Sequence, residues 1–65
     1  MKILTFEDLK PVKGIAYGKL NLWRMEKRGE FPKRIALGRG RHGWADHEID
    51  AWIEERIRAR DEQAA

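Results

Sequence analysis

The sequence predicts a small α+β domain that is mostly helical, with three helices and one two-stranded hairpin. Glycines and prolines divide the 65 residues into short segments, and most of these segments place their apolar residues three or four positions apart, as helices do. Residues 33–44 differ, because two short segments there flank a glycine-rich centre that is typical of a hairpin. With 42% apolar residues and no cysteine, the core is expected to be thin and free of disulfides.

The first helix is predicted to begin after Thr5, because an acidic residue three positions later completes a capping box. It should be short, since Pro11 has no amide hydrogen and disfavours helical geometry at the residue before it. Phe6, Leu9 and Val12 are expected to share its inner face.

The second helix is predicted over residues 18–28, ended by Gly29, a residue type that suits the position after a helix. At about 100° per residue, Leu22 and Met25 lie on one narrow inner side. The opposite side carries a cluster of basic residues, which is the arrangement that a helix entering a DNA groove requires.

Next, residues 33–37 and 41–44 are predicted to pair as a hairpin, with Gly38 and Gly40 supplying the positive φ that a tight turn needs. The last helix should begin with Asp46 as its N-cap. Its core-facing stripe is expected to consist of Ile49, Trp52, Ile53, Arg56 and Ile57. The whole chain, residues 1–65, is predicted to be one domain, with residues 61–65 as a flexible tail.

The aromatic residues are expected to fill much of the core. Trp44, Trp52 and Phe31 should be buried, because a thin core needs large apolar groups. Trp23 is expected either to pack against the hairpin or to lie partly exposed beside a DNA backbone.

Charge is distributed unevenly along the chain. Residues 10–43 hold ten basic and two acidic side chains, a net charge of +8, whereas residues 44–65 have a net charge of −4. This asymmetry favours one strongly positive surface that faces a polyanion, with a merely solvated face as the alternative.

The residue types argue against an enzyme. Without a serine there is no Ser-His-Asp arrangement, and without a cysteine there is no thiolate metal site. His42 and His47 stand near Asp46 and Glu48, but the two histidines belong to different predicted elements and no further ligand has a suitable spacing. We therefore expect no catalytic, cofactor-binding or metal-binding residues. No apolar run is long enough for a signal peptide or a membrane span, which favours an intracellular location.

The predicted order of elements is helix, turn, basic helix, hairpin and helix. This is the order of a winged helix-turn-helix, whose second helix lies in the DNA major groove. Arg24 would form bidentate hydrogen bonds with guanine or phosphate, and Asn21 would pair with adenine. Other basic residues of this helix suit phosphates, the hairpin arginines suit a flanking minor groove, and the tyrosine would donate to a phosphate or lie free on the surface. The predicted DNA-binding residues are Tyr17, Lys19, Asn21, Arg24, Lys27, Arg28, Lys33, Arg39 and Arg41.

An ordered set of short motifs over residues 3–60 resembles the AlpA family of small phage and prophage transcriptional regulators. The set consists of Trp23-Arg24, Gly29-Glu30-Phe31-Pro32, Leu37-Gly38, Gly43-Trp44 and Ala51-Trp52-Ile53. Family members, which are related to excisionases and to MerR-type DNA-binding domains, often have Ser or Thr where this chain has Gly18. The resemblance implies a winged helix-turn-helix that binds DNA to activate transcription or to direct prophage excision as a recombination directionality factor.

The expected partners are double-stranded DNA, a second copy of the chain as a dimer or head-to-tail array, and an integrase or RNA polymerase. No membrane partner is expected, and the resemblance implies the cytoplasm of a bacterial host, in association with the nucleoid. The alternative from another class is a protein-interaction adaptor or antirepressor that uses the same basic face to bind an acidic protein.

Overall fold

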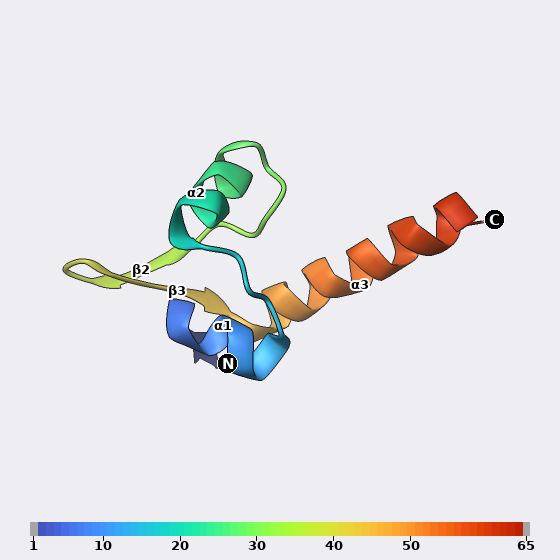
Figure 1. The fold of residues 1–65 in the computed structure, drawn as a ribbon. Coiled ribbons are helices and arrows are strands. Elements are labelled where there is room, and N and C mark those ends of the chain that lie inside the picture. Colours follow the sequence, from blue (N-terminus) through green and yellow to red (C-terminus); the bar gives the residue numbers. More distant parts are fainter. Residues whose placement is uncertain (1, 65) are drawn as a thin grey trace.

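The computed structural model describes residues 2–64 and has the predicted α+β architecture of a small winged helix-turn-helix. Along the chain the elements are β1 (Ile3–Leu4), α1 (Phe6–Lys13), α2 (Lys19–Lys27), β2 (Ile35–Gly38), β3 (Arg41–Ala45) and α3 (Asp46–Ala64). Figure 1 shows α1 and α2 in the body of the molecule, with the β2–β3 hairpin projecting on one side and α3 on the other. The molecule is therefore elongated, with extents of 46 × 24 × 17 Å.

The sheet has three antiparallel strands in the order β1-β3-β2, one more than the sequence predicts. Strand β1 places Ile3 opposite Ala45, and the Asp46 amide donates to the carbonyl of Lys2 at 2.8 Å. Sequence patterns miss this strand because it has only two residues and its partner lies at the far end of the hairpin. Its pairing fixes the base of the hairpin against the start of α1.

Helix α1 is short, as predicted, with eight residues, but Pro11 lies inside it and does not displace Lys10 from helical geometry. The helix ends at Lys13, where Gly14 adopts a positive φ of 73°. A proline inside so short a helix removes only one backbone hydrogen bond, and both helix ends are held independently. Val12 is also misplaced by the prediction: it is 47% exposed, because the neighbouring Lys13 occupies the side that faces α3.

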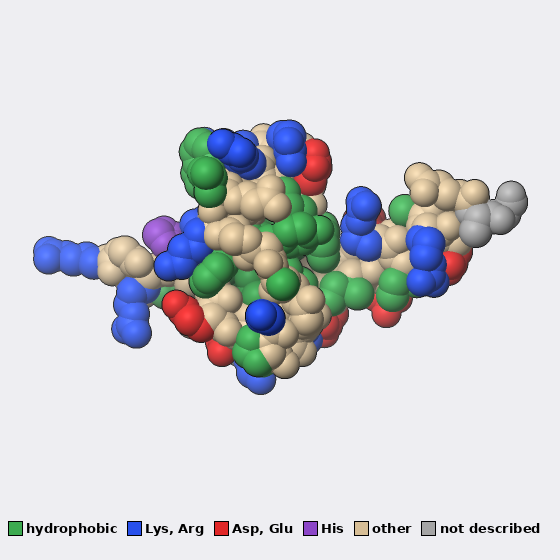
Figure 2. Space-filling model, viewed as in Figure 1, with side chains coloured by type: hydrophobic (Ala, Val, Ile, Leu, Met, Phe, Trp, Pro, Cys, Tyr) green, Lys and Arg blue, Asp and Glu red, His purple; other side chains and the backbone are tan. Residues whose placement is uncertain are grey.

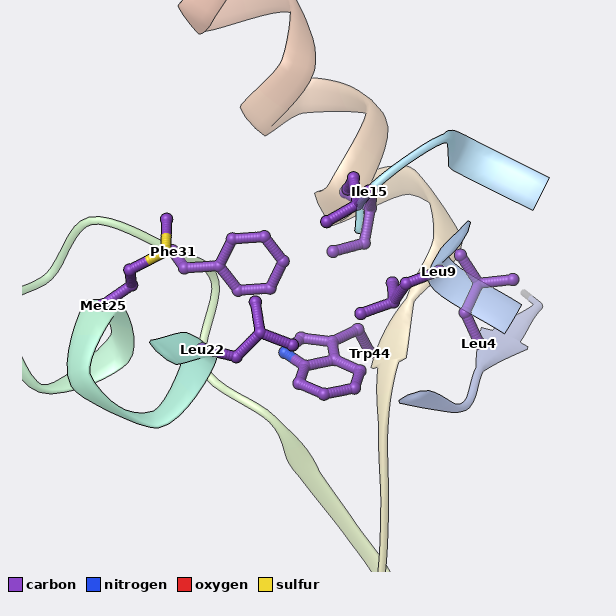
Figure 3. Packing of buried hydrophobic residues seen from close by; sticks show 8 residues of the cluster. Leu4, Leu9, Ile15, Leu22, Met25, Phe31 and Trp44 are labelled. Carbon is purple, nitrogen blue, oxygen red and sulfur yellow. The ribbon is translucent and has the colours of Figure 1, made fainter. Parts of the chain in front are cut away.

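The core lies where α1, α2, the sheet and the start of α3 meet. Its centre includes Leu4, Leu9, Leu22 and Ile49, each no more than 1% exposed. Figure 3 shows Leu22 pointing toward the aromatic rings that the α2–β2 loop and β3 contribute. The ring of Phe31 meets two tryptophans edge to face, at centroid distances of 6.0 Å to Trp44 and 4.9 Å to Trp52.

Helix α3 packs against the core only along its first part. Ile49 is fully buried and Ile53 is partly buried, whereas Ile57, expected to continue the stripe, is 41% exposed. Beyond this point the helix extends away from the body (Figure 1). Residues 61–64, predicted as a tail, form its last turn, and residue 65 of that tail lies outside the described residues. No helix among residues 2–64 combines the length and hydropathy needed to cross a membrane.

Candidate nucleic-acid interface

Helix α2 is held by one apolar side and leaves the other side free. Gly18 forms its N-cap with φ −73° and ψ 163°, and after the helix Gly29 adopts a φ of 72°. Leu22 and Met25 turn inward and are 0% and 8% exposed. Because these two side chains lie on one narrow strip of the helix, most of its surface stays in solvent.

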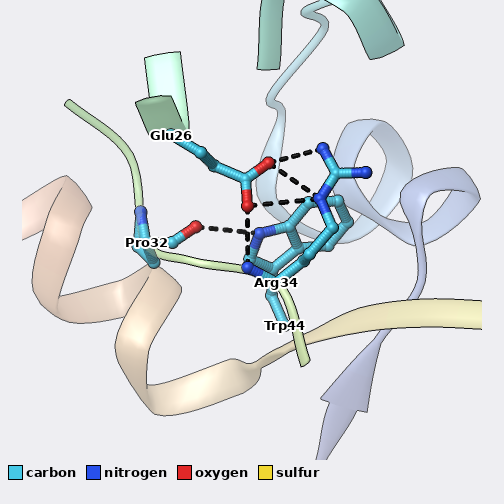
Figure 4. Close-up of polar contacts among 4 residues, drawn as sticks. All are labelled: Glu26, Pro32, Arg34 and Trp44. Atoms are coloured by element: carbon cyan, nitrogen blue, oxygen red, sulfur yellow. Dashed lines mark hydrogen bonds and ion pairs between the residues drawn. The ribbon is translucent and has the colours of Figure 1, made fainter. Parts of the chain in front are cut away.

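Glu26 ties α2 to the start of the hairpin. One carboxylate oxygen accepts the backbone N–H of Arg34 at 2.8 Å, and the other accepts the Arg34 Nε at 2.9 Å (Figure 4). The Arg34 guanidinium lies 5.5 Å from the ring centroid of Trp44, and the Trp44 indole N–H donates to the carbonyl of Pro32 at 3.0 Å. These contacts fix the orientation of the hairpin relative to α2.

A second ionic contact joins α1 to α3. The ammonium group of Lys13 lies 2.8 Å from Asp46 Oδ1 and 2.7 Å from Asp50 Oδ1. The hydrogen bonds to these carboxylates raise the pKa of Lys13, and the hydrogen bond from Lys13 lowers the pKa of Asp46. At the other end of α1, hydrogen bonds from Thr5 lower the pKa of Asp8.

All nine predicted DNA-binding residues are exposed, but they lie in four separate places. Arg24 and Lys27 project from the outer side of α2. Among the described residues Arg24 has no ion-pair partner, while the Lys27 ammonium lies 5.1 Å from the ring centroid of Trp23. This outer side thus presents positive charge that the protein does not neutralise.

A second pair lines an open groove between the first turn of α2 and the hairpin. Lys19 comes from the helix and Arg41 from β3, and Phe6, Leu37 and His42 also line this groove. The ammonium group of Lys19 lies 5.1 Å from the ring centroid of Phe6. The groove therefore brings together two predicted residues that are 22 positions apart in the sequence.

Three other predicted residues line a shallow hollow between α2 and α3. Tyr17, Asn21 and Arg28 share this hollow with Trp52. The Arg28 guanidinium also pairs with Glu30 at 3.0 Å, and both side chains are more than half exposed. This side of α2 consequently carries less free positive charge than the outer side.

The remaining two predicted residues belong to the hairpin. Arg39 stands at its tip between Gly38 and Gly40, both with positive φ, and Lys33 precedes β2. Figure 2 shows Lys and Arg side chains at the free end of the hairpin. The tip extends away from α2, so it would reach a different part of any ligand that α2 contacts.

The sequence does not predict the structural roles of two charged residues at this surface. Glu26 and Arg34 were counted only as charges, although the place of Glu26 on the inner side of a basic helix was a signal of its structural role. Of the two alternatives given for Trp23, its 49% exposure agrees with the partly exposed one, and Leu20, one turn before it, is 60% exposed. Among residues 2–64 no three His, Asp or Glu side chains come close enough together to hold a metal ion.

Comparison with known families gives one match that covers most of the chain. The family model described as "Prophage CP4-57 regulatory protein (AlpA)" matches residues 3–57. No curated protein matches the chain.

Proposed function

The chain belongs to the AlpA family of prophage regulatory proteins, and from this premise we propose that it binds double-stranded DNA sequence-specifically. In this proposal α2 lies in the major groove, and binding regulates transcription or directs prophage excision. One observation carries the proposal most directly: the outer side of α2 presents exposed, unneutralised cations while Leu22 and Met25 anchor the helix from behind.

The geometry of α2 suits a major groove, which admits one α-helix. Arg24 has no ion pair among residues 2–64, so contacting DNA would cost it no existing interaction. Its planar guanidinium matches the two acceptors of guanine and also a phosphate. Lys27, one turn away on the same side, would neutralise a phosphate of the adjoining backbone.

The groove between α2 and the hairpin would hold a phosphate backbone. Lys19 and Arg41 both line it, so a strand lying there would meet two cations, beside the carboxylate of Glu7, which also lines the groove. Beyond the groove Arg39 at the hairpin tip would reach a flanking minor groove, where the negative potential is concentrated.

The other predicted residues would extend the contact along the DNA. Asn21 would pair with an adenine edge, and Tyr17 and Lys33 would donate to phosphates. Arg28 would first have to exchange its partner Glu30 for a phosphate, an exchange that costs little because exposed ion pairs are weak.

The alternative, an adaptor that binds an acidic protein through the same cations, makes a different prediction about DNA. Such a protein would show only non-specific DNA affinity, with a Kd of about 10⁻⁴ to 10⁻⁶ M. Regulation of transcription and direction of excision are both compatible with a second copy on adjacent DNA. Both are also compatible with an integrase or RNA polymerase as a protein partner.

The proposal is tested by selecting duplexes from a random-sequence library with the wild-type protein and measuring affinity for the selected duplex by fluorescence anisotropy. We expect Arg24→Ala to weaken binding by about 5- to 150-fold, the equivalent of one lost base contact, without changing the circular dichroism spectrum. Arg60→Ala removes the same charge from the far part of α3 and should leave affinity within about twofold. Equal effects of the two substitutions would contradict the role of α2.

Salt dependence gives a second measurement on the same duplex. If one protomer neutralises about 4–6 phosphates, the logarithm of the association constant should fall with the logarithm of salt concentration at a slope of about −4 to −5. A selection that yields no preferred sequence, together with affinity in the non-specific range, would favour the adaptor instead.

A further inference from the structure

Two large apolar side chains lie in solvent on the charged outer side of α2. Leu20 is 60% exposed and Trp23 is 49% exposed. Figure 2 shows hydrophobic side chains beside Lys and Arg side chains over this helix. Neither residue packs into the core, which α2 reaches through Leu22 and Met25 alone.

The two residues share the outer side with the cations considered above. Leu20, Trp23, Arg24 and Lys27 occupy positions i, i+3, i+4 and i+7 of one helix, which places them along a single stripe. Leu20 lies in the first turn of α2. Viewed down the helix axis, its side chain direction falls between those of Arg24 and Lys27. A solvent-exposed stripe of two apolar and two basic residues has no structural function within the described chain.

We propose that Leu20 and Trp23 contact the C5-methyl groups of thymine in the major groove and so make this protein select thymine-containing sites. The inference rests on the proposed function, because it requires α2 to lie in the groove. Beyond that function, it assigns the preference for thymine to two apolar residues, Leu20 and Trp23, which charge and hydrogen bonding alone would not indicate as contact residues.

Charge complementarity argues for DNA as the occupant of this stripe. Arg24 and Lys27 follow Leu20 on the same stripe at i+4 and i+7, so a partner that covers the stripe must also accept two positive charges. The thymine edge of a major groove offers an apolar methyl group, and phosphates lie on both sides of it. The first turn of a recognition helix is also the part that usually contacts base edges.

Trp23 supports the same arrangement. The Lys27 ammonium lies 5.1 Å from its ring centroid, which holds the lysine chain beside the ring. The stripe is therefore partly ordered before any ligand binds, with its apolar and basic groups already side by side.

The experiment compares two duplexes of one sequence, the one selected above, with thymine or with deoxyuridine at every thymine position. Deoxyuridine keeps the hydrogen-bonding groups and lacks only the methyl. We expect the wild-type protein to bind the deoxyuridine duplex about fourfold more weakly for each methyl group contacted. Leu20→Ala and Trp23→Ala should each weaken binding to the thymine duplex and bring the ratio of the two affinities closer to one.

A matched control separates a direct contact from an effect on DNA shape. Val12→Ala removes a similarly exposed apolar side chain from α1 and should retain the wild-type ratio. If deoxyuridine acts by changing DNA shape, the ratio of the two affinities should be the same for Leu20→Ala as for the wild type. If it acts by removing a methyl contact, the ratio for Leu20→Ala should be closer to one. Leu20→Ala should also fold normally, because it alters an exposed position and alanine favours helices.

Three outcomes would overturn the inference. Equal binding of both duplexes by the wild type would show that no methyl is contacted, while leaving sequence-specific DNA binding intact. An unchanged ratio in both variants, with a shift in their sedimentation, would show that a second copy of the chain covers the stripe. If the selection yields no preferred sequence at all, the proposed function fails first and the inference with it.

Discussion

Glu26 is an acidic residue on a helix whose other charged residues are basic, and its surroundings explain why. Its side chain is only 10% exposed, and it accepts hydrogen bonds from both the backbone and the guanidinium of Arg34. A carboxylate in such a place is stabilised by its donors and would be costly to leave unpaired. One cation of the basic segment is thus used inside the protein, and the residues with free charge are those farther out.

Replacing Glu26 tests this role. Glu26→Ala leaves the part-buried guanidinium of Arg34 without its partner, so we expect the free energy of unfolding to fall by about 2 kcal/mol. Urea denaturation followed by tryptophan fluorescence measures the change. Glu30→Ala is the control, because its pair with Arg28 is exposed and should contribute less than about 0.5 kcal/mol. Similar losses in both variants would show that Glu26 has no special structural role.

Lys13 and its two aspartates predict how stability depends on pH. The lowered pKa of Asp46 means that its contribution is complete above the unfolded value of about 3.9 and is lost as pH falls through the folded value. The raised pKa of Lys13 means that its contribution is complete below about 10.4 and is lost as pH rises through the folded value. Both contributions are present together between these limits.

Urea midpoints measured from pH 2 to 7 would test the acid side of this window. Asp46→Asn should lower the midpoint at neutral pH and should reduce the further loss on acidification, because one titrating group has been removed. Asp61→Asn alters an aspartate that pairs only with its exposed neighbour Arg60. That variant should follow the wild-type pH dependence, and if Asp46→Asn does so as well, its ion pair with Lys13 does not stabilise the fold.

At the scale of elements, Gly43 determines whether β1 can join the sheet. A Cβ atom added there would lie 2.7 Å from Ile3 Cγ2 and 2.8 Å from the carbonyl oxygen of Leu4. Gly43→Ala should therefore separate β1 from β3 or shift both, lowering the free energy of unfolding by about 1–3 kcal/mol. Gly18→Ser is the matched control, since Gly18 has a negative φ and nothing within 4 Å of an added Cβ. Chemical denaturation of the two variants gives the comparison, and equal stability would contradict a close approach at Gly43.

The elements differ in how well local sequence predicts them. Helix α2 is predicted correctly because Gly18, Leu22, Met25 and Gly29 mark its two ends and its inner side within twelve residues. Strand β1 depends on partners forty or more residues away, and no local pattern marks it. Pro11 predicts a short helix correctly but not the helical geometry of Lys10, because its local cost is exceeded by the contacts that hold the two ends of α1.

The features of the proposed interface also differ in how well local sequence predicts them. Exposure of Arg24 and its basic neighbours is predictable from helix geometry, because any side opposite a buried strip faces solvent. The groove that unites Lys19 with Arg41 is not, since it depends on how the hairpin and the start of α1 are placed relative to α2. Direct contact of any of these residues with DNA remains a prediction for the binding experiments.

At the scale of the whole molecule, the shape separates the two signs of charge. The hairpin and α3 project in opposite directions (Figure 1), and all acidic side chains of residues 44–65 lie on α3. Arg24 remains exposed, so the acidic segment does not cover the proposed interface within one chain. The basic excess of residues 10–43 would favour orientations in which α2 and the hairpin approach the duplex first.

Removing residues 60–65 tests whether the far part of α3 has any other task. The core contacts of α3 end near Ile53, so the truncated chain should melt within a few degrees of the full chain, as measured by circular dichroism. Its affinity for the selected duplex should be unchanged or slightly higher, because the deletion removes two acidic side chains and one basic one. A loss of more than about tenfold in affinity with an unchanged melting temperature would instead place the end of α3 in the complex.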